Sequence, residues 1–275
     1  MNIEKVLSIV DTVREAGASI MDIYESGSFG VEIKPDNSPV TRADKLSNDL
    51  ISRHLEELTP DIPVISEEGA AIDHEKRSSW RRFYLVDPLD GTRSFIRRTG
   101  EFTINVGLIE NGIPVMGIIY SPASGVLYYS LEGAGAYKCK GNIEPVRISV
   151  LPQQDLGGLI CVTSSSHGLS EQAAFRETGM VNDFLPTGSS LKFCLVAEGK
   201  AHIYPRFGPL WEWDTAAGHS ILMEAGGRVV SLSDFSEVAY NKREMLHAGF
   251  IALPSWMLDD MKPYLANIMH GRNDV

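Results

Sequence analysis

Cysteine is scarce in this chain, and a long apolar run is missing. Cys139, Cys161 and Cys194 are widely spaced among 275 residues and form no Cys-x-x-Cys pair. An odd number of dispersed cysteines excludes a disulfide framework and a cysteine-ligated zinc site, and it favours a reducing cytoplasm. No apolar stretch approaches the roughly twenty residues of a membrane-spanning helix. Asp11 and Arg14 interrupt the first apolar pattern, as a signal-peptide core would not. We therefore expect a cytoplasmic protein without an integral membrane segment, and loose peripheral association with an inner membrane is left open.

Positive charge is also in short supply. The chain has 25 Lys and Arg against 36 Asp and Glu, a formal net charge of -11. Binding of a nucleic-acid polymer depends on neutralising its phosphates with Lys and Arg, so this balance argues against such a partner. An anionic small molecule would have to be met by a metal ion or by a local group of cations.

The order of predicted elements divides the chain loosely near residues 140–155. A chain of this length can form one large domain or two closely packed ones. Amphipathic helices at 6–24 and after Thr41, followed by an antiparallel meander over 102–129, predict an N-terminal α+β subdomain spanning 1–150. Alternating strands and helices predict a C-terminal α/β subdomain spanning 151–275.

The second predicted helix has a clear start and an expected buried face. Thr41-Arg42-Ala43-Asp44 is a capping-box pattern, in which the acid at the third helical position reaches back to the cap. Leu46, Leu50, Leu55 and Leu58 are expected on one face of this helix.

Acidic residues gather in three short motifs. Glu67-Glu68 and Asp87-Pro88-Leu89-Asp90-Gly91-Thr92 each follow a strand-like apolar run, and Asp214 opens an Ala-rich helix that should end at Gly226-Gly227. Sites in layered α/β proteins commonly lie at strand ends. Mg2+ prefers a few carboxylates together with water and substrate phosphate. The motifs therefore indicate a divalent-metal site and the hydrolysis of a phosphate ester.

Each motif also has a purely structural interpretation. Asp-Pro and Asp-Gly are ordinary turn dipeptides, Asp214 would suit a helix N-cap, and Glu67 and Glu68 would suit a solvated strand end. Asp44 by itself is better explained as the capping-box acid. The joint occurrence of all these motifs favours the metal site.

The Asp-Pro-Leu-Asp-Gly-Thr motif, the paired glutamates and Trp-Asp-Thr-Ala-Ala-Gly at 213–218 resemble the inositol monophosphatase superfamily of Mg2+-dependent, lithium-sensitive phosphatases. The resemblance covers nearly the whole chain and implies the layered αβαβα sandwich of that superfamily. It implies two or three Mg2+ ions per site. It also implies that Glu68 supports the metal ligands without binding the metal, and that Asp44 and Thr92 activate the attacking water. The implied metal ligands are Glu67, Asp87, Asp90, Asp214 and the carbonyl of Leu89.

Residues of the second half point to one branch of that superfamily. The segment 188–218 looks most like the 3'(2'),5'-bisphosphate nucleotidases, because Lys192 and Arg206 stand where polyol-selective relatives carry neutral or acidic residues. Cations beside the metals suit a second phosphate on the substrate. Taken alone, Lys192 could instead be a solvated helix residue and Arg206 a surface ion pair. The substrate contacts implied by the resemblance are Gly91, Ser164, His167, Gly188, Lys192 and Arg206.

The sequence thus predicts an enzyme that removes the 3'-phosphate of adenosine 3',5'-bisphosphate, a by-product of sulfur metabolism, acting as a monomer or weak dimer. An inositol- or sugar-phosphate monoesterase is the alternative, and a non-catalytic metal or nucleotide sensor is a second. A haloacid-dehalogenase phosphatase is disfavoured, since its motif is Asp-x-Asp near the N-terminus and two residues separate Asp87 from Asp90 here.

Overall fold

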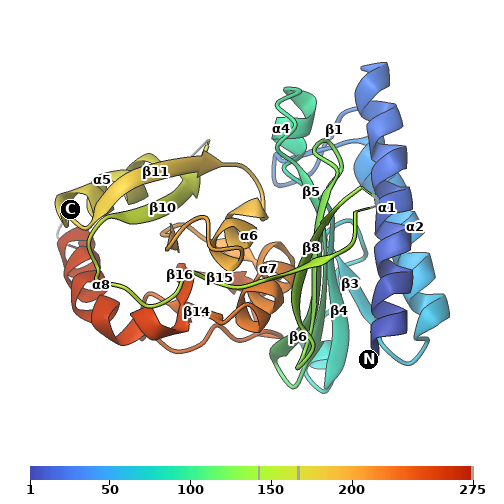
Figure 1. The fold of residues 1–275 in the computed structure, drawn as a ribbon. Helices are drawn as coiled ribbons and strands as arrows, with labels where there is room; N and C mark the ends of the chain where they lie inside the picture. Colours follow the sequence, from blue (N-terminus) through green and yellow to red (C-terminus); the bar gives the residue numbers. More distant parts are fainter. Residues whose placement is uncertain (142, 166–167, 274–275) are drawn as a thin grey trace.

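The computed structural model describes residues 1–141, 143–165 and 168–273 of the chain. Its elements stack as helices, sheet, helices, sheet and helices, and the two sheets lie in opposite halves of the molecule (Figure 1). This mixed α/β arrangement agrees with the fold class expected from the sequence.

The larger sheet has seven strands in the order β3-β4-β5-β6-β7-β8-β9. The first two strands are parallel, and every later pair is antiparallel. The predicted meander is therefore confirmed, and it extends to β9. The strands are β3 (Val64–Ser66), β4 (Arg82–Asp90), β5 (Thr103–Glu110), β6 (Ile113–Ser121), β7 (Val126–Leu131), β8 (Gly135–Lys140) and β9 (Val146–Ile148).

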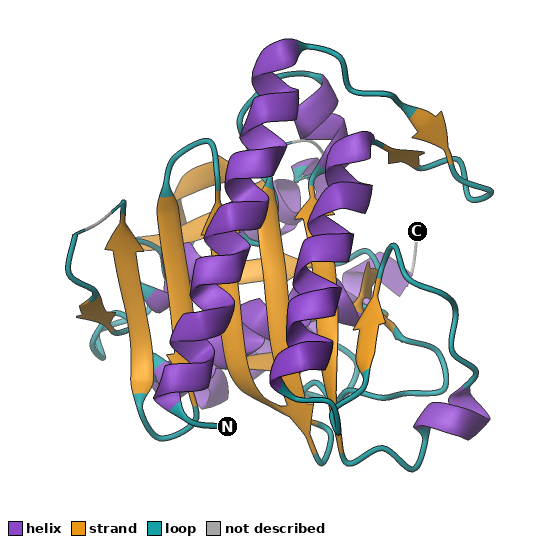
Figure 2. Cartoon of the chain, turned by 90° about the vertical axis from the view of Figure 1, so that its right-hand side faces the viewer, coloured by secondary structure: helices purple, strands orange, loops and turns teal. Residues whose placement is uncertain are grey.

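Helices α1 (Ile3–Ser26) and α2 (Arg42–Leu58) cover one face of this sheet (Figure 2). The prediction of the buried face of α2 is partly wrong, because Leu46 is 41% exposed. Asp44 and Ser47 turn inward instead, together with Ile51 and Leu55. The physical reason is that both polar side chains have partners: Asp44 completes the capping box, and the Ser47 hydroxyl donates to the carbonyl of Pro88 at 2.8 Å.

Helix α7 (Glu212–Glu224) lies against the other face of the large sheet, beside α6 (Leu191–Ala197). Nearly every side of α7 is buried, as expected of a helix between two sheets. Glycines of the large sheet allow close approach, since a Cβ atom at Gly117 would lie 2.2 Å from the carbonyl oxygen of Ala217. The prediction that Asp214 is the N-cap of this helix is wrong, because the N-cap residue is Trp211. Asp214 is the third helical residue, and its Oδ2 atom accepts the Trp211 backbone N–H at 3.0 Å.

The second half is built on a three-stranded sheet in the order β12-β16-β14, with the parallel pair β10 and β11 beside it. Outer helices α5 and α8 enclose its core, which includes Phe175 and Leu265. Its elements are β10 (Leu159–Ser164), α5 (Leu169–Glu177), β11 (Val181–Thr187), β12 (Tyr204–Arg206), β14 (Gly227–Ser231), β16 (Phe250–Pro254), the 3-10 helix η1 (Ser255–Met257) and α8 (Leu258–Asn273).

Several short elements lie around the junction of the two halves. Antiparallel pairing joins β1 to β2 and β13 to β15. These elements are β1 (Glu32–Ile33), β2 (Pro39–Val40), α3 (His74–Arg77), α4 (Thr92–Ile96), β13 (Leu210–Trp211) and β15 (Leu246–His247).

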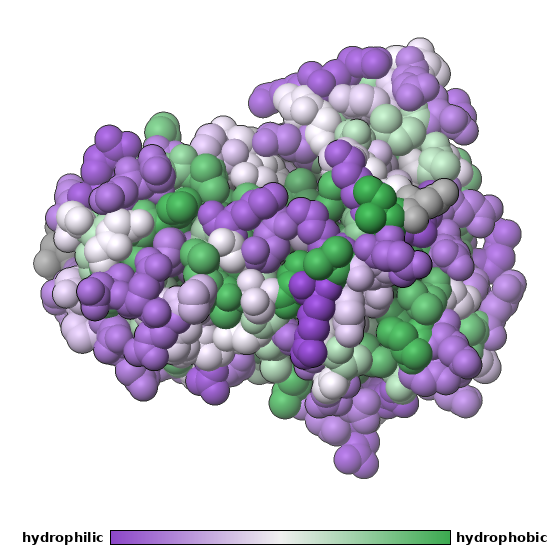
Figure 3. Space-filling model, in the orientation of Figure 1, coloured by the Kyte–Doolittle hydropathy of each residue, from purple (hydrophilic) through white to green (hydrophobic). Residues whose placement is uncertain are grey.

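Hydrophobic residues are interspersed with hydrophilic ones on the face of the molecule shown in Figure 3. Among the described residues, no helix combines the length and the apolar character that crossing a membrane would require. The division of the chain at 150 stays a prediction, since α7 from the second half packs on the sheet of the first.

Candidate active site

The acidic motifs converge at one edge of the large sheet. Strands β3 and β4 are parallel neighbours, so Glu67 and Asp87 lie at adjacent strand ends, and the first turn of α7 brings Asp214 to the same place. One carboxylate oxygen from each of these three residues lies within 4.8 Å of the other two. The structure therefore brings together three of the residues that the sequence predicted as ligands.

Burial disfavours the charged form of these carboxylates. Asp87 is 1% exposed. Burial raises the pKa of Asp87 and of Asp214 well above its usual range, and the charges of neighbouring acids, including Asp90, raise both further. Repulsion among close carboxylates is relieved by a cation. Hard oxygen donors in this arrangement fit a divalent metal ion.

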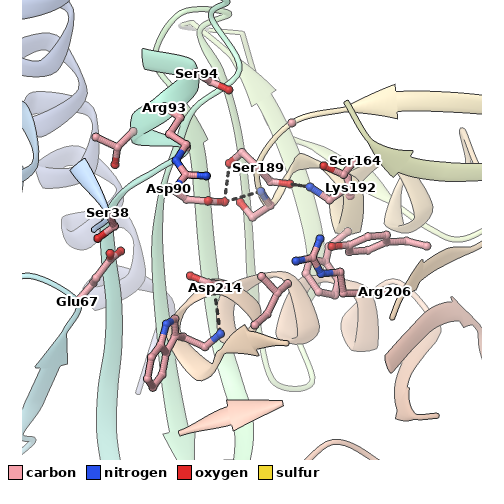
Figure 4. Close-up of a pocket in the computed structure, with 18 of the residues that line it drawn as sticks. Ser38, Glu67, Asp90, Arg93, Ser94, Ser164, Ser189, Lys192, Arg206 and Asp214 are labelled. Atoms are coloured by element: carbon pink, nitrogen blue, oxygen red, sulfur yellow. Dashed lines mark hydrogen bonds between the residues drawn. The ribbon is translucent and has the colours of Figure 1, made fainter. Parts of the chain in front are cut away.

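Asp90 lies beside this group and joins the two halves of the molecule. Its Oδ2 atom accepts hydrogen bonds of 2.7 Å from the Ser189 hydroxyl and from the Ser190 backbone N–H (Figure 4). Asp90 is outside the three-carboxylate cluster, although its charge raises the pKa values of Glu67, Asp87 and Asp214. Its role as a ligand stays a prediction.

The loop between Asp87 and Thr92 is held by its own hydrogen bonds. The Leu89 N–H donates to Asp87 Oδ1 at 3.0 Å, and the Leu89 carbonyl lies 3.3 Å from the Thr92 hydroxyl. Gly91 precedes α4 with a φ of +96°, and a Cβ atom there would lie 2.8 Å from the Glu101 carbonyl oxygen. This turn therefore requires glycine for both its conformation and its close packing.

Glu67 and Glu68 share one cation. Lys34 Nζ lies 2.9 Å from Glu67 Oε1 and also forms an ion pair with Glu68. The interpretation of both glutamates as simply solvated is therefore wrong. Glu68 contacts Lys34 and is not a member of the carboxylate cluster.

Asp44 has both of the roles that the sequence left open. Its Oδ2 atom accepts the Thr41 backbone N–H at 2.8 Å, which completes the capping box. Its Oδ1 atom accepts the Thr92 hydroxyl at 3.0 Å. Burial raises the pKa of Asp44, against the opposing effect of the hydrogen bonds from Thr41 and Thr92. The capping-box acid Asp44 is thus hydrogen-bonded to Thr92, the residue that follows the Asp-Gly turn.

A cavity of about 440 Å³ opens beside the carboxylates, between the two halves. Its lining includes the residues that were predicted to contact the substrate, Gly91, Ser164, Gly188, Lys192 and Arg206 (Figure 4). His167 lies outside the described residues. The lining is completed by Ser38, Pro39, Glu67, Asp90, Thr92, Arg93, Ser94, Ser189, Ser190, Phe193, Tyr204, Leu210, Trp211 and Asp214.

Lys192 and Arg206 form a cationic wall of this cavity. Lys192 is 7% exposed, so its interpretation as a solvated helix residue is wrong. Its ammonium group donates to the Ser189 carbonyl and lies 5.3 Å from the centre of the Tyr204 ring. The pKa of Lys192 is lowered to about 8, chiefly by burial; the charge of Asp90 opposes this shift and the charge of Arg206 adds to it. Arg206 donates to the carbonyls of Gly208 and Pro209, and among the described residues it forms no ion pair.

Glu101 also joins the two halves, next to Gly188 of the cavity lining. Its carboxylate accepts the Gly188 N–H at 3.2 Å and the Ser165 hydroxyl at 2.8 Å. A Cβ atom at Gly188 would lie 2.6 Å from the Cβ atom of Glu101. The absence of a side chain at Gly188 therefore lets the Glu101 side chain approach the backbone closely.

Sequence reasoning missed several residues of the site. Ser189 and Ser190, which bind Asp90, could have been suspected because they lie just before Lys192, and in the structure they immediately precede α6. Arg93 directly follows the Asp-Gly-Thr turn, but one arginine on a predicted helix has no signal of its own. Ser38 reaches the cavity from a turn that no acidic motif marks.

Comparison with known proteins links the chain to one phosphatase family. The model of the inositol monophosphatase family matches residues 2–262. A Salmonella typhimurium protein named 3'(2'),5'-bisphosphate nucleotidase CysQ is 44% identical over 245 residues, covering 88% of this chain and 96% of that protein. The Escherichia coli K12 protein of that name is 42% identical over 244 residues, with the same coverage.

A solved structure agrees with these sequence matches. The crystal structure of CysQ from Bacteroides thetaiotaomicron superposes with a TM-score of 0.80 at 40% identity, covering 91% of this chain and 97% of that one. A Thermotoga maritima inositol monophosphatase structure has the same fold, with a TM-score of 0.78 at 24% identity. By family model, sequence and fold, the chain belongs to the inositol monophosphatase family.

Proposed function

We propose that this protein is a Mg2+-dependent 3'(2'),5'-bisphosphate nucleotidase that converts adenosine 3',5'-bisphosphate to AMP and phosphate. The observation that carries the proposal is a single cavity with a carboxylate cluster at one side and Lys192 and Arg206 at the other. The first feature suits metal-assisted phosphate chemistry, and the second suits a substrate with a further phosphate. The relatives at 42–44% identity carry the name of this activity.

Metal dependence is general to the family, and the donor set of this chain fits it. Glu67, Asp87, Asp90, Asp214 and the Leu89 carbonyl would hold the ions. Bound Mg2+ would neutralise phosphoryl oxygens and lower the pKa of water. The number of ions and the choice of Mg2+ over other divalent cations are part of the proposal.

Thr92 and Asp44 are placed to orient the attacking water. When the Thr92 hydroxyl donates its proton to Asp44 Oδ1, its lone pairs remain free to accept a proton from water. A water held in this way presents an oxygen lone pair to phosphorus. The new O–P bond forms as the bond from phosphorus to the ribose O3' breaks. The proton that the water gives up passes through the Thr92 hydroxyl to Asp44, and O3' takes its proton from solvent.

The other wall of the cavity would recognise the rest of the nucleotide. Lys192 and Arg206 would contact the 5'-phosphate, with Ser164, Gly188 and His167 near the nucleoside. A partly desolvated ammonium group forms stronger ionic interactions than an exposed one. The burial of Lys192 therefore supports its selection as a phosphate contact.

The test is phosphate release from matched esters with and without Mg2+. Adenosine 3',5'-bisphosphate, 3'-AMP and inositol 1-phosphate differ in the features that the cavity should distinguish. We expect Mg2+-dependent turnover with the highest kcat/KM on the bisphosphate. Preference for inositol 1-phosphate would replace the proposal with the monoesterase alternative, and ligand binding without turnover would replace it with the sensor.

A further inference from the structure

Arg93 is a cation of the cavity that lies on the wall opposite Lys192. It is the second residue of α4 and directly follows Thr92. Figure 4 shows its guanidinium group directed back toward Asp90, on the side of the cavity formed by the N-terminal half. Lys192 on α6 and Arg206 on β12 belong to the C-terminal half.

The guanidinium group of Arg93 does not bind another group among the described residues. Within the described residues, its side chain makes no hydrogen bond, ion pair or ring contact. Nearby cations differ in this respect. Arg98 lies over the Tyr24 ring at 4.9 Å, and Arg206 donates to the Gly208 carbonyl at 3.2 Å. Arg93 therefore keeps its donors available for a ligand.

The depth of the groups in the cavity indicates which part of a ligand Arg93 would meet. The scissile phosphate has to reach the carboxylate cluster, in which Asp87 is 1% exposed. Arg93 is exposed and lines the same cavity as Glu67 and Asp214. A second anionic group on the same ligand would lie away from the cluster, between the exposed Arg93 and the buried Lys192.

We propose that Arg93 is a further specificity residue, which contacts the non-scissile phosphate from the N-terminal half while Lys192 and Arg206 contact it from the C-terminal half. This inference rests on the proposed nucleotidase function. A phosphate held from both halves needs a cation on each wall, and guanidinium groups bind phosphate oxygens in bidentate geometry. Substrates without a second phosphate would gain little from Arg93.

The test compares two substrates that differ only in this phosphate. We expect Arg93→Ala to lower kcat/KM for adenosine 3',5'-bisphosphate by roughly tenfold to a hundredfold, the usual effect of losing one charge-assisted contact. For 3'-AMP, which lacks the 5'-phosphate, we expect less than about a threefold change. Arg93→Lys should keep part of the preference for the bisphosphate, since it retains the positive charge but cannot form the bidentate contact of a guanidinium group.

Arg97→Ala is the matched control, because Arg97 is an exposed arginine at the end of the same helix and does not line the cavity. It should leave both substrates unchanged. Calorimetric titration with AMP gives a second readout, in which Arg93→Ala weakens binding and Arg97→Ala does not. Thermal melting of each variant checks that α4 stays folded.

The outcomes separate this inference from the proposed function. If the wild type does not prefer the bisphosphate to 3'-AMP and inositol 1-phosphate, the nucleotidase proposal fails. If the wild type shows that preference and Arg93→Ala keeps it, or loses activity on both nucleotides equally, the inference about Arg93 alone is overturned. An equal effect of Arg97→Ala would also overturn it, because the effect would then be one of net charge.

Discussion

The protonation of Lys192 should be visible in the kinetics. Burial lowers its pKa to about 8, so the free enzyme loses this positive charge as the pH rises through that value. We expect kcat/KM for adenosine 3',5'-bisphosphate to fall above about pH 8, because kcat/KM reports ionisations of the free enzyme. Lys192→Arg should remove this fall, since a guanidinium group stays protonated.

The measurement is a pH profile of kcat/KM for wild type and Lys192→Arg on two substrates. The profile for 3'-AMP should lack the alkaline fall, because that substrate has no phosphate for Lys192 to bind. An unchanged alkaline limb in Lys192→Arg would assign the ionisation to another group and remove the support for a Lys192–phosphate contact.

Thr92 and Asp44 should affect turnover rather than binding. Asp44→Asn and Thr92→Ala are each expected to lower kcat by roughly 10²–10⁴-fold, with KM largely kept, because they orient the attacking water. Thr92→Ser retains the hydroxyl and should recover most of the activity.

Thermal melting separates this role from helix capping. Thr92→Ala leaves the bond between Asp44 and the Thr41 N–H intact, so its melting temperature should stay near that of the wild type. If Asp44→Asn lowers stability and substrate binding together but leaves kcat unchanged, Asp44 serves only the cap.

Single residues were predictable from the sequence where a motif fixed their chemistry. Glu67, Asp87 and Asp214 meet as expected, because each lies near a strand end or in the first turn of a helix at the same edge. The motifs carry no information about contacts made across the junction of the halves. The bonds from Ser189 and Ser190 to Asp90 depend on how two distant segments meet, which local spacing does not encode.

At the scale of elements, the contact between β6 and α7 sets the position of Asp214. We expect Gly117→Ala to lower the free energy of unfolding by about 1–3 kcal/mol, since the new Cβ atom would lie 2.2 Å from the Ala217 carbonyl oxygen. The melting temperature should fall by roughly 2–4 °C for each kcal/mol. Thermal or urea unfolding measures the change.

Gly157→Ala is the matched substitution for this test. No atom lies within 4 Å of a Cβ atom added at Gly157, so its stability should stay near that of the wild type. Equal stability of Gly117→Ala and wild type would contradict the close packing of α7 on the sheet.

Elements with a regular apolar pattern were predicted best. Helix α1 buries the residues of its apolar stripe, and strands β5 and β6 of the meander, which follow apolar runs, are buried along nearly their whole length. Helix α2 does not, since its inward side carries Asp44 and Ser47 for the site. The start of α7 was missed because a helix buried on nearly all sides has no polar face to mark its ends.

At the scale of the whole molecule, a chain with a net charge of -11 concentrates carboxylates at one buried site. Because bound ions would offset their repulsion, we expect Mg2+ to raise the melting temperature of chelator-treated protein. A ligand that binds only the native state at a hundred times its Kd contributes about 2.7 kcal/mol.

Asp87→Asn makes this prediction specific to the site. The substitution removes one of the charges that repel each other, so the chelated variant should be at least as stable as the chelated wild type, yet it should lose most of the Mg2+-induced shift. Asp61→Asn makes the same change of net charge at an exposed acid outside the cavity, and it should keep the full shift. Melting curves with and without Mg2+ give both quantities. If Asp87→Asn responds to Mg2+ as fully as Asp61→Asn, the cation stabilises the protein through its overall charge, and the carboxylate cluster is not where it binds.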